Sequence, residues 1–245
     1  MNRIKVGLIG LGTIGTGVAK TLLENSALLK QRLGFSLDLT AIADIDIRRS
    51  RGIAIPRKLL TTDAKALIAN PDIDVIVELI GGIEPARTFI LDALKAGKHV
   101  VTANKALLAS KGKELFDTAR TCGRDLYYEA SVGGGVPIIK ALRESLVANN
   151  FTFIYGILNG TCNFILTEMS EKGSSFDDTL KKAQEFGYAE ADPTMDIEGV
   201  DSAHKLAIIT SLAYGVPPDM GSIYIEGISK LDILDIGYAR ELGYK

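Results

Sequence analysis

The sequence predicts an α/β protein built on a doubly wound parallel sheet. Short apolar segments rich in β-branched residues alternate with segments of helical periodicity over the first 130 residues. A glycine-rich turn directly follows the first of these apolar segments. Alternation of this kind favours parallel strands that are joined by helices. The length of 245 residues and the hydrophobic content of 47% fit one large packed domain or two small ones.

Each element of the first part follows from a local pattern. The apolar run Ile4 to Ile9 predicts a buried strand, and Val18, Leu22 and Leu23 have the spacing of a helix. Pro85 is typical of a first helical position. The predicted strands are 4–9, 37–43, 73–80, 99–103 and 126–129, and the predicted helices follow Gly15, run from Pro85 to near Gly97, and cover 105–119.

The pattern changes after Ser131, which predicts a second domain of α+β type. A helix is expected from Pro137, and the alternation over 151–158 predicts a strand. Further helices are predicted over 161–171, 176–186, 200–214 and 231–242, with a last strand through Ile223, Ile225 and Ile228. We therefore divide the chain into domains 1–130 and 131–245.

Composition excludes several classes of partner. The net charge is -2 and no run of Lys and Arg occurs, so neither nucleic acid nor an anionic membrane is expected as a partner. The N-terminus has the pattern of neither a signal peptide nor a membrane span. Cys122 and Cys162 have no metal or redox spacing, so we expect free thiols and a cytoplasmic location.

The turn after the first strand matches G-x-G-x-x-G at Gly10, Gly12 and Gly15. Gly10 permits a tight turn, Gly12 lets a pyrophosphate approach the backbone, and Gly15 lets the helix pack close to the strand. The helix that begins at Thr13 and Ile14 offers free N–H groups to phosphate oxygens. The motif in this strand–turn–helix context predicts a Rossmann-type domain that binds NAD or NADP.

Sequence leaves the choice between the two cofactors open. Asp44 ends the second strand, where an acidic residue accepts hydrogen bonds from the adenosine ribose and favours NAD. Arg48, Arg49 and Arg51 follow and could hold the 2′-phosphate of NADP, but a solvated helix start explains them equally well.

Two lysines are candidate acids. Lys105 follows the fourth strand, and ligands of open α/β sheets bind beyond the carboxyl ends of the strands, so Lys105 could reach a substrate or the nicotinamide. Lys205 lies four residues after Asp201, so the two share one helix face. A helix-dipole Asp with a surface salt bridge is the plainer explanation of that pair. The chain has only two histidines, which leaves lysine as the best available acid.

Carboxylates gather just before Lys205. Several carboxylates beside glycines and a proline suggest a loop that binds a cation or an ammonium group, although the spacing matches no EF-hand. They are Glu190, Asp192, Asp196, Glu198 and Asp201.

Together these residues resemble the homoserine dehydrogenase family along essentially the whole chain. The family signature matches from Ala183 and Gly187, through Asp192-Pro193, Asp196, Gly199 and Asp201, to Lys205. Three further stretches are similar to the family, namely Thr102 to Lys105, Glu129 to Pro137 and Gly156 to Thr161.

The resemblance implies reversible reduction of aspartate 4-semialdehyde to homoserine with NAD(P)H, on the route to threonine and methionine. It implies that Lys205 donates the proton, that Lys105 assists at the reacting oxygen and at the cofactor, and that Asp201 lies close by. It implies that Glu190 binds the substrate, with Asp196 near it. From the residues themselves we add the hypothesis that the loop at Gly160 and Thr161, opening a helix, binds the substrate α-carboxylate.

The resemblance also implies a structural sodium ion and a homodimer for the full-length protein. The sodium ligands would be the Glu129 side chain and the carbonyls of Val132, Gly134 and Val136. Members of the family normally continue beyond the position of Lys245, so we expect a truncated chain with poor stability on its own. Two alternatives remain: a related amino-acid dehydrogenase, against which the acidic signature argues, and an inert fragment that only binds dinucleotide.

Overall fold

The computed structural model describes residues 3–244 and divides into two compact units, Met1–Val147 and Ala148–Lys245. Each unit has its own hydrophobic core. None of the helices within residues 3–244 is long and apolar enough to cross a membrane.

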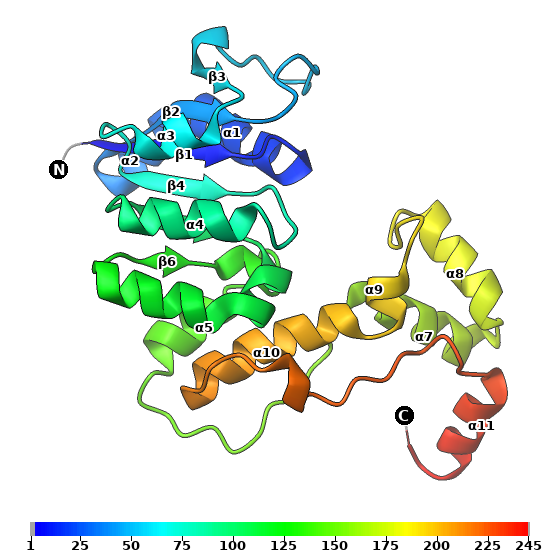
Figure 1. Ribbon diagram of the computed structural model, residues 1–245. Helices are drawn as coiled ribbons and strands as arrows, with labels where there is room; N and C mark the ends of the chain where they lie inside the picture. Colours follow the sequence, from blue (N-terminus) through cyan, green and yellow to red (C-terminus); the bar gives the residue numbers. More distant parts are fainter. Residues whose placement is uncertain (1–2, 245) are drawn as a thin grey trace. The chain divides into compact units, whose positions relative to one another are not determined.

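The first unit is built on a six-stranded parallel sheet (Figure 1). Its strand order, β3-β2-β1-β4-β5-β6, reverses direction between β1 and β4 and confirms the doubly wound fold. Strand β3 has only two residues and was not predicted from the sequence. The strands are β1 (Arg3–Ile9), β2 (Ser36–Ala43), β3 (Leu60–Thr61), β4 (Val75–Glu78), β5 (His99–Thr102) and β6 (Leu126–Tyr127).

Helices cover the sheet because the central strands are apolar on both faces. Leu8, Ile42, Ile76 and Val100 are fully buried, as expected for a parallel sheet. A cluster of α1 and β2 side chains forms one core around Leu8. The helices of this unit are α1 (Thr13–Glu24), α2 (Ser26–Leu33), α3 (Ala64–Ala69), α4 (Ala86–Lys95), α5 (Lys105–Cys122) and α6 (Ile138–Lys140), and the short turns are η1 (Arg57–Leu59), η2 (Glu129–Ser131) and η3 (Ala141–Ser145).

The first compact unit extends past residue 130, where the sequence suggested a boundary. Both oxygens of the Glu129 carboxylate accept backbone N–H groups at the start of α6, from Ile139 at 2.9 Å and Lys140 at 2.8 Å. The Arg143 guanidinium lies 5.0 Å from the ring centre of Tyr127, at the end of β6. These contacts keep residues 131–147 with the sheet.

The second unit is helical in the part that the structure describes. Ile165 and Met169 of α7 pack with Ala183 of α8 and with Ala189. Its helices are α7 (Gly160–Lys172), α8 (Phe176–Glu185), α9 (Thr194–Ile197), α10 (Val200–Tyr214) and α11 (Ile233–Glu241), with the short turn η4 (Met220–Ser222).

Two predicted strands of this unit are wrong. Residues 151–158 form no regular secondary structure and pair with no strand among residues 148–244, and Phe153, Tyr155 and Ile157 are exposed. Their alternation is typical of a strand, but a strand also needs a partner for its backbone groups. The segment around Ile225 packs on the turn before α10 instead, where the Ile228 N–H donates to the Ile197 carbonyl at 2.7 Å.

Candidate functional site

The glycine turn between β1 and α1 is dictated by close packing. Gly10 has φ +98°, and a Cβ there would lie 2.7 Å from the backbone of Leu79. A Cβ on Gly15 would lie 2.0 Å from the Gly10 carbonyl oxygen. A Cβ on Gly12 would meet no atom within 4 Å apart from its neighbours in the chain. The turn thus needs two glycines for its own geometry and leaves an open side at the third.

Thr13 and Ile14 begin α1 on this open side, and both are exposed. Gly12 precedes the helix and makes no side-chain cap. The first N–H groups of α1 therefore face the open side of the turn without a capping side chain, which is the usual setting for a phosphate.

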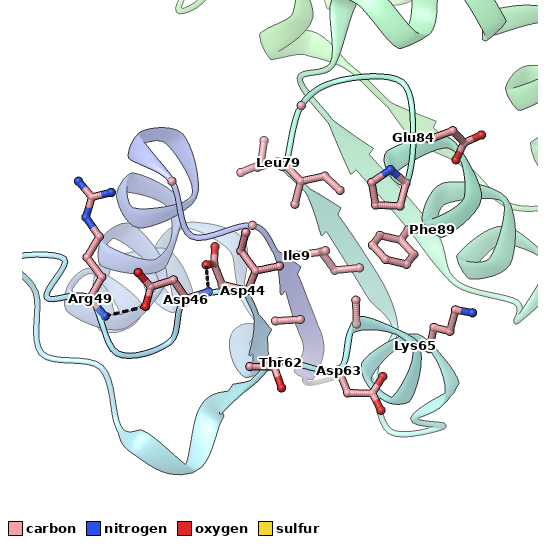
Figure 2. A pocket seen from close by; sticks show the side chains of 18 of the residues that line it. Ile9, Asp44, Asp46, Arg49, Thr62, Asp63, Lys65, Leu79, Glu84 and Phe89 are labelled. Atoms are coloured by element: carbon pink, nitrogen blue, oxygen red, sulfur yellow. Dashed lines mark hydrogen bonds between the residues drawn. The ribbon is translucent and has the colours of Figure 1, made fainter.

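A cavity of about 900 Å³ adjoins the turn (Figure 2). Its walls come from the ends of β1, β2 and β4 and from the segments that follow them. Residues that line it include Gly10, Gly12, Asp44, Arg49, Arg51 and Ile80. Its place at the reversal of strand order is where open α/β sheets bind ligands.

Asp44 joins the glycine turn to the segment after β2. Its Oδ2 accepts the Leu11 N–H at 2.5 Å, while Oδ1 accepts the Asp46 N–H at 2.8 Å. An Arg51 Nη2 lies 3.2 Å from the same Oδ1, and both side chains of this ion pair are 12% exposed. The Asp44 charge is therefore partly neutralised before any ligand arrives.

The three arginines differ in their environment. Arg51 is largely buried, and its Nε has no hydrogen-bond partner among residues 3–244. Arg48 and Arg49 are exposed, and their backbone N–H groups donate to the Asp46 carboxylate, both at 3.1 Å. Figure 2 shows the Arg49 side chain pointing away from Asp44.

Lys105 is the first residue of α5 and follows β5 after two residues. Asn104 caps this helix, because its Oδ1 accepts the Leu107 N–H at 3.1 Å. The structure thus places Lys105 beyond the carboxyl end of β5. The glycine turn, which follows β1, lies at the same end of this parallel sheet.

Of the predicted sodium ligands, Glu129 begins η2, and the other three lie in the loop that follows it. The Glu129 carboxylate caps α6, as described above, and the Val136 carbonyl accepts the Ile138 N–H at 2.8 Å. Gly134 has φ +58° and is exposed, whereas Val132 is buried. Residues 3–244 contain no group of three or more His, Cys, Asp or Glu side chains that could hold a metal ion.

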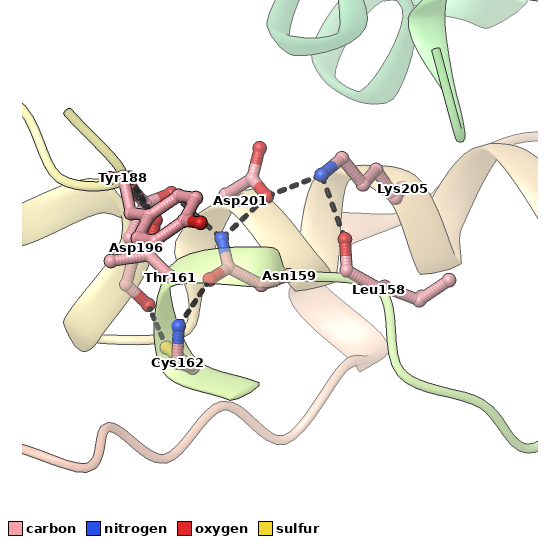
Figure 3. A network of polar contacts seen from close by, with 8 residues as sticks. All are labelled: Leu158, Asn159, Thr161, Cys162, Tyr188, Asp196, Asp201 and Lys205. Atoms are coloured by element: carbon pink, nitrogen blue, oxygen red, sulfur yellow. Dashed lines mark hydrogen bonds and ion pairs between the residues drawn. The ribbon is translucent and has the colours of Figure 1, made fainter. Parts of the chain in front are cut away.

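In the second unit, Lys205 lies in a fixed polar environment (Figure 3). Its Nζ donates to Asp201 Oδ2 at 2.6 Å and to the Leu158 carbonyl at 2.8 Å. The Lys205 side chain is 18% exposed and that of Asp201 only 6%. This pair is too buried for the plain surface salt bridge considered from the sequence, whose contribution would be small.

Asn159, whose side chain the sequence analysis did not single out, connects this pair to the acidic loop. Its Nδ2 donates to Asp201 Oδ2 at 2.9 Å and to Asp196 Oδ1 at 2.7 Å, while its Oδ1 caps α7 by accepting the Cys162 N–H. The Thr161 hydroxyl contacts Asp196 Oδ2 at 3.1 Å and the Tyr188 carbonyl at 2.7 Å. Asp196 is therefore occupied by the chain's own donors.

Gly199 and Asp192 shape the backbone that leads into α10 and α9, on either side of Asp196. Gly199 precedes α10 with φ +79°, and a Cβ there would lie 3.0 Å from the Glu226 carbonyl oxygen. Asp192 accepts the backbone N–H and the hydroxyl of Thr194 at the start of α9, and the hydroxyl bond lowers the pKa of Asp192. Glu190 is exposed in the same loop.

Burial and carboxylates together perturb one neighbouring thiol. The Cys162 Sγ donates to the Asp196 carbonyl at 3.1 Å. Burial, with the nearby charges of Asp196 and Asp201, raises the pKa of Cys162 to about 11. The site therefore holds this cysteine as a neutral thiol rather than as a nucleophile.

Comparison with known proteins decides the family. A family model described as homoserine dehydrogenase matches residues 137–245, and a second, described as the homoserine dehydrogenase NAD binding domain, matches residues 10–129. The chain belongs to the homoserine dehydrogenase family. The second match identifies residues 10–129, which include the glycine turn and Asp44, as an NAD(P)-binding domain.

Known homoserine dehydrogenases match along the whole chain. The enzyme of Neisseria gonorrhoeae is 50% identical over 245 residues, which are 100% of this chain and 56% of that protein. A crystal structure of a homoserine dehydrogenase from Thiobacillus denitrificans has a TM-score of 0.92 at 49% identity and covers 99% of this chain and 56% of that one.

A more distant structure is a hyperthermophilic archaeal homoserine dehydrogenase in complex with NADPH, with a TM-score of 0.79 and 28% identity over 94% of this chain and 76% of that one. The chain thus spans little more than half the length of the bacterial relatives.

Proposed function

We propose that this chain carries the catalytic residues of an NAD(P)-dependent homoserine dehydrogenase, which interconverts aspartate 4-semialdehyde and L-homoserine. The observation that carries the proposal is the Lys205 ammonium group, held by Asp201 and the Leu158 carbonyl within a largely buried network. Family membership supports it.

The chemistry follows from the charge that develops on the substrate. Bound NADH or NADPH would supply a hydride for the aldehyde carbon, and negative charge would then develop on the substrate oxygen. Lys205 donates a proton to that oxygen, and Asp201 holds the ammonium group in position. Family membership assigns Lys105 a supporting role at the reacting oxygen, and we place the functional boundary of its domain near residue 130. A positioned general acid typically contributes about 10²–10⁴ in rate.

The substrate amino acid needs both signs of charge in its site. Glu190 is exposed in the acidic loop and accepts hydrogen bonds from the substrate ammonium group. Asp196 supports it indirectly, since its carboxylate orients Asn159 and Thr161. The backbone N–H groups of Gly160 and Thr161, in the first turn of α7, bind the α-carboxylate.

We propose that the adenosine end of the cavity accepts either NADH or NADPH. With NADH, Asp44 accepts from the ribose while Arg51 stays paired to it. With NADPH, the unpartnered Nε of Arg51 and its terminal nitrogens take the 2′-phosphate. The archaeal relative was solved in complex with NADPH, which supports NADPH as one of the two cofactors. Arg51→Gln should weaken NADPH binding about tenfold more than NADH binding, a difference of ~1.4 kcal/mol; equal losses would contradict the role of Arg51.

Sodium and self-association complete the proposal. Glu129 with the carbonyls of Val132, Gly134 and Val136 would hold a structural sodium ion, so the melting temperature should be higher in NaCl than in choline chloride at equal ionic strength.

The full-length protein would be a homodimer with a strand partner for residues 151–158, which fits the exposed Phe153. Light scattering of the full-length protein tests this, and a monomer at micromolar concentration would contradict it.

The deciding experiment measures oxidation of NADH and NADPH at 340 nm with aspartate 4-semialdehyde. Lys205→Ala should abolish turnover yet keep cofactor binding, while Lys172→Ala, an exposed lysine of α7, should leave turnover unchanged. Turnover that survives in Lys205→Ala would refute the proposed acid. Cofactor binding without turnover in the unaltered chain would favour a dinucleotide-binding fragment, and turnover with another amino acid would favour a related dehydrogenase.

A further inference from the structure

A ring of hydrogen bonds lies at the carboxyl ends of β4 and β5, and it starts from a buried carboxylate that no role above uses. Glu78 is the last residue of β4 and is completely buried. Its Oε2 accepts the Thr102 hydroxyl at 2.7 Å, and Thr102 is its register partner at the end of β5. Its Oε1 accepts the Ile80 N–H at 2.8 Å.

The ring closes through the cap of α5. The Asn104 N–H donates to the Thr102 hydroxyl oxygen at 3.0 Å, and the Asn104 Nδ2 donates to the Gly82 carbonyl at 2.6 Å. Gly82 lies two residues after Ile80, so the chain itself completes the ring. Glu78 therefore ties the segment after β4 to the segment that ends in Lys105.

On the side away from β5, the backbone of Glu78 lies beside the end of β1, where the glycine turn begins. Ile9, the last residue of β1, is the register partner of Glu78, and the Leu79 N–H donates to the Ile9 carbonyl at 2.8 Å. The backbone of Leu79 then packs against Gly10, where a Cβ would approach to 2.7 Å. The ring thus spans the distance from the glycine turn to Asn104 and Lys105.

A carboxylate matches the two donors that face it in this ring. The Ile80 N–H and the Thr102 hydroxyl both donate to Glu78, while the Thr102 oxygen accepts from the Asn104 N–H. A glutamine of the same size would turn an NH₂ group toward one of these donors and leave a buried polar group unpaired. Burial of a charged carboxylate is costly, so its presence here calls for a role that offsets the cost.

We infer that Glu78 is a positioning residue, whose carboxylate sets the spacing between the glycine turn and the Asn104–Lys105 segment, the two places that take the pyrophosphate and the nicotinamide end of the dinucleotide. This inference rests on the cofactor binding proposed above. A dinucleotide that spans both places depends on that spacing, whereas a ligand that fills only the adenosine end beside Asp44 does not.

The test compares dissociation constants of NADH, from its fluorescence, and of AMP, from calorimetry. In Glu78→Gln and in Thr102→Val, each of which breaks the ring, the NADH constant should rise about tenfold, as expected for loss of ~1.4 kcal/mol. The AMP constant should stay within about twofold, since a change of that size is below ~0.5 kcal/mol. Thr102→Ser keeps the hydroxyl and should restore NADH binding.

Lys98→Met supplies a matched control for stability. Lys98 is also buried, and it lies just before β5, at the end of the sheet opposite to Glu78. Its Nζ donates to the carbonyls of Asn70 and Ile73, which precede β4. This variant should melt earlier yet bind NADH normally. Equal weakening of NADH and AMP by Glu78→Gln, or a loss of NADH affinity in Lys98→Met as large as in Thr102→Val, would overturn the inference. No NADH binding by the unaltered chain would overturn the proposed function as well.

Discussion

Asn159→Asp is the most informative single change in the second unit, because it alters charge without altering shape. Asparagine and aspartate are both good helix caps, so the cap of α7 is preserved. The change removes the Nδ2 group that donates to Asp196 and Asp201, and it places a third carboxylate between those two. Asn159 is only 6% exposed, so water cannot replace the lost donor.

The expected loss follows from the two bonds. Hydrogen bonds to charged acceptors contribute roughly 1.5–3 kcal/mol each. Thr161 and Lys205 still donate to the two carboxylates, so we take the lower end and expect a loss of about 3 kcal/mol in the free energy of unfolding. For a chain of this length the melting temperature should fall by roughly 6–12 °C.

The loss should also depend on pH. Repulsion raises the pKa of the introduced carboxyl in the folded state above its value in the unfolded chain. The penalty is therefore full at neutral pH and is relieved as the pH falls through the raised folded-state pKa. Thermal melts at pH 7.5 and pH 5 measure both effects.

The reciprocal exchange provides the control. Asp63→Asn alters the exposed cap of α3, whose carboxylate accepts the Ala66 N–H at 2.9 Å, and should change stability by less than about 0.5 kcal/mol. An Asn159→Asp protein that melts within 2 °C of the unaltered chain at about neutral pH would refute the central role of Asn159, given the ~2–4 °C expected for each kcal/mol.

Three further predictions have distinct expected outcomes. Gly12→Ala should melt normally but lose NADH binding in a fluorescence titration, whereas Gly15→Ala should itself unfold more easily, because only at Gly15 would the new Cβ meet the protein; equal effects on stability would contradict this packing. Cys162 should react slowly with iodoacetamide at pH 8, and its rate should rise about tenfold per pH unit up to its pKa of about 11. This pH dependence of the rate should be lost in urea, and mass spectrometry measures the extent of alkylation. Arg87→Met should lower the urea midpoint of unfolding only slightly, because Arg87 pairs with Glu114 at a partly exposed site, and 1 M NaCl should reduce that difference; a salt-independent loss would indicate packing instead.

Local pattern predicted most of the first unit because its strands are short, apolar and bounded by turn residues. The glycine turn fixed the position of β1 and α1, and Asn104 and Lys105 marked the end of β5. Strand β3 escaped because two residues carry no periodicity. The segment 151–158 has strand-like alternation, but alternation cannot supply a neighbour for its backbone groups.

The candidate site shows the same limit. Spacing of four residues predicted that Asp201 and Lys205 meet, since both lie on one helix. Asn159 lies 42 residues before Asp201, and no local pattern indicates that its side chain joins Asp196 to Asp201. The Glu78 ring likewise joins residues of two strands and two loops, so it emerges only from the register of the sheet.

The two bonds that anchor Lys205 also have a directional consequence. An ammonium group carries three N–H bonds at tetrahedral angles, and two of them are committed to Asp201 and Leu158. Rotation about the terminal C–N bond is thereby arrested, and the third N–H points along a single axis. A carbonyl oxygen that accepts this proton must therefore lie on that axis. The anchoring of one lysine thus fixes where the reacting oxygen lies relative to α10, whereas the carbonyl face that is exposed must be set by the other contacts of the substrate.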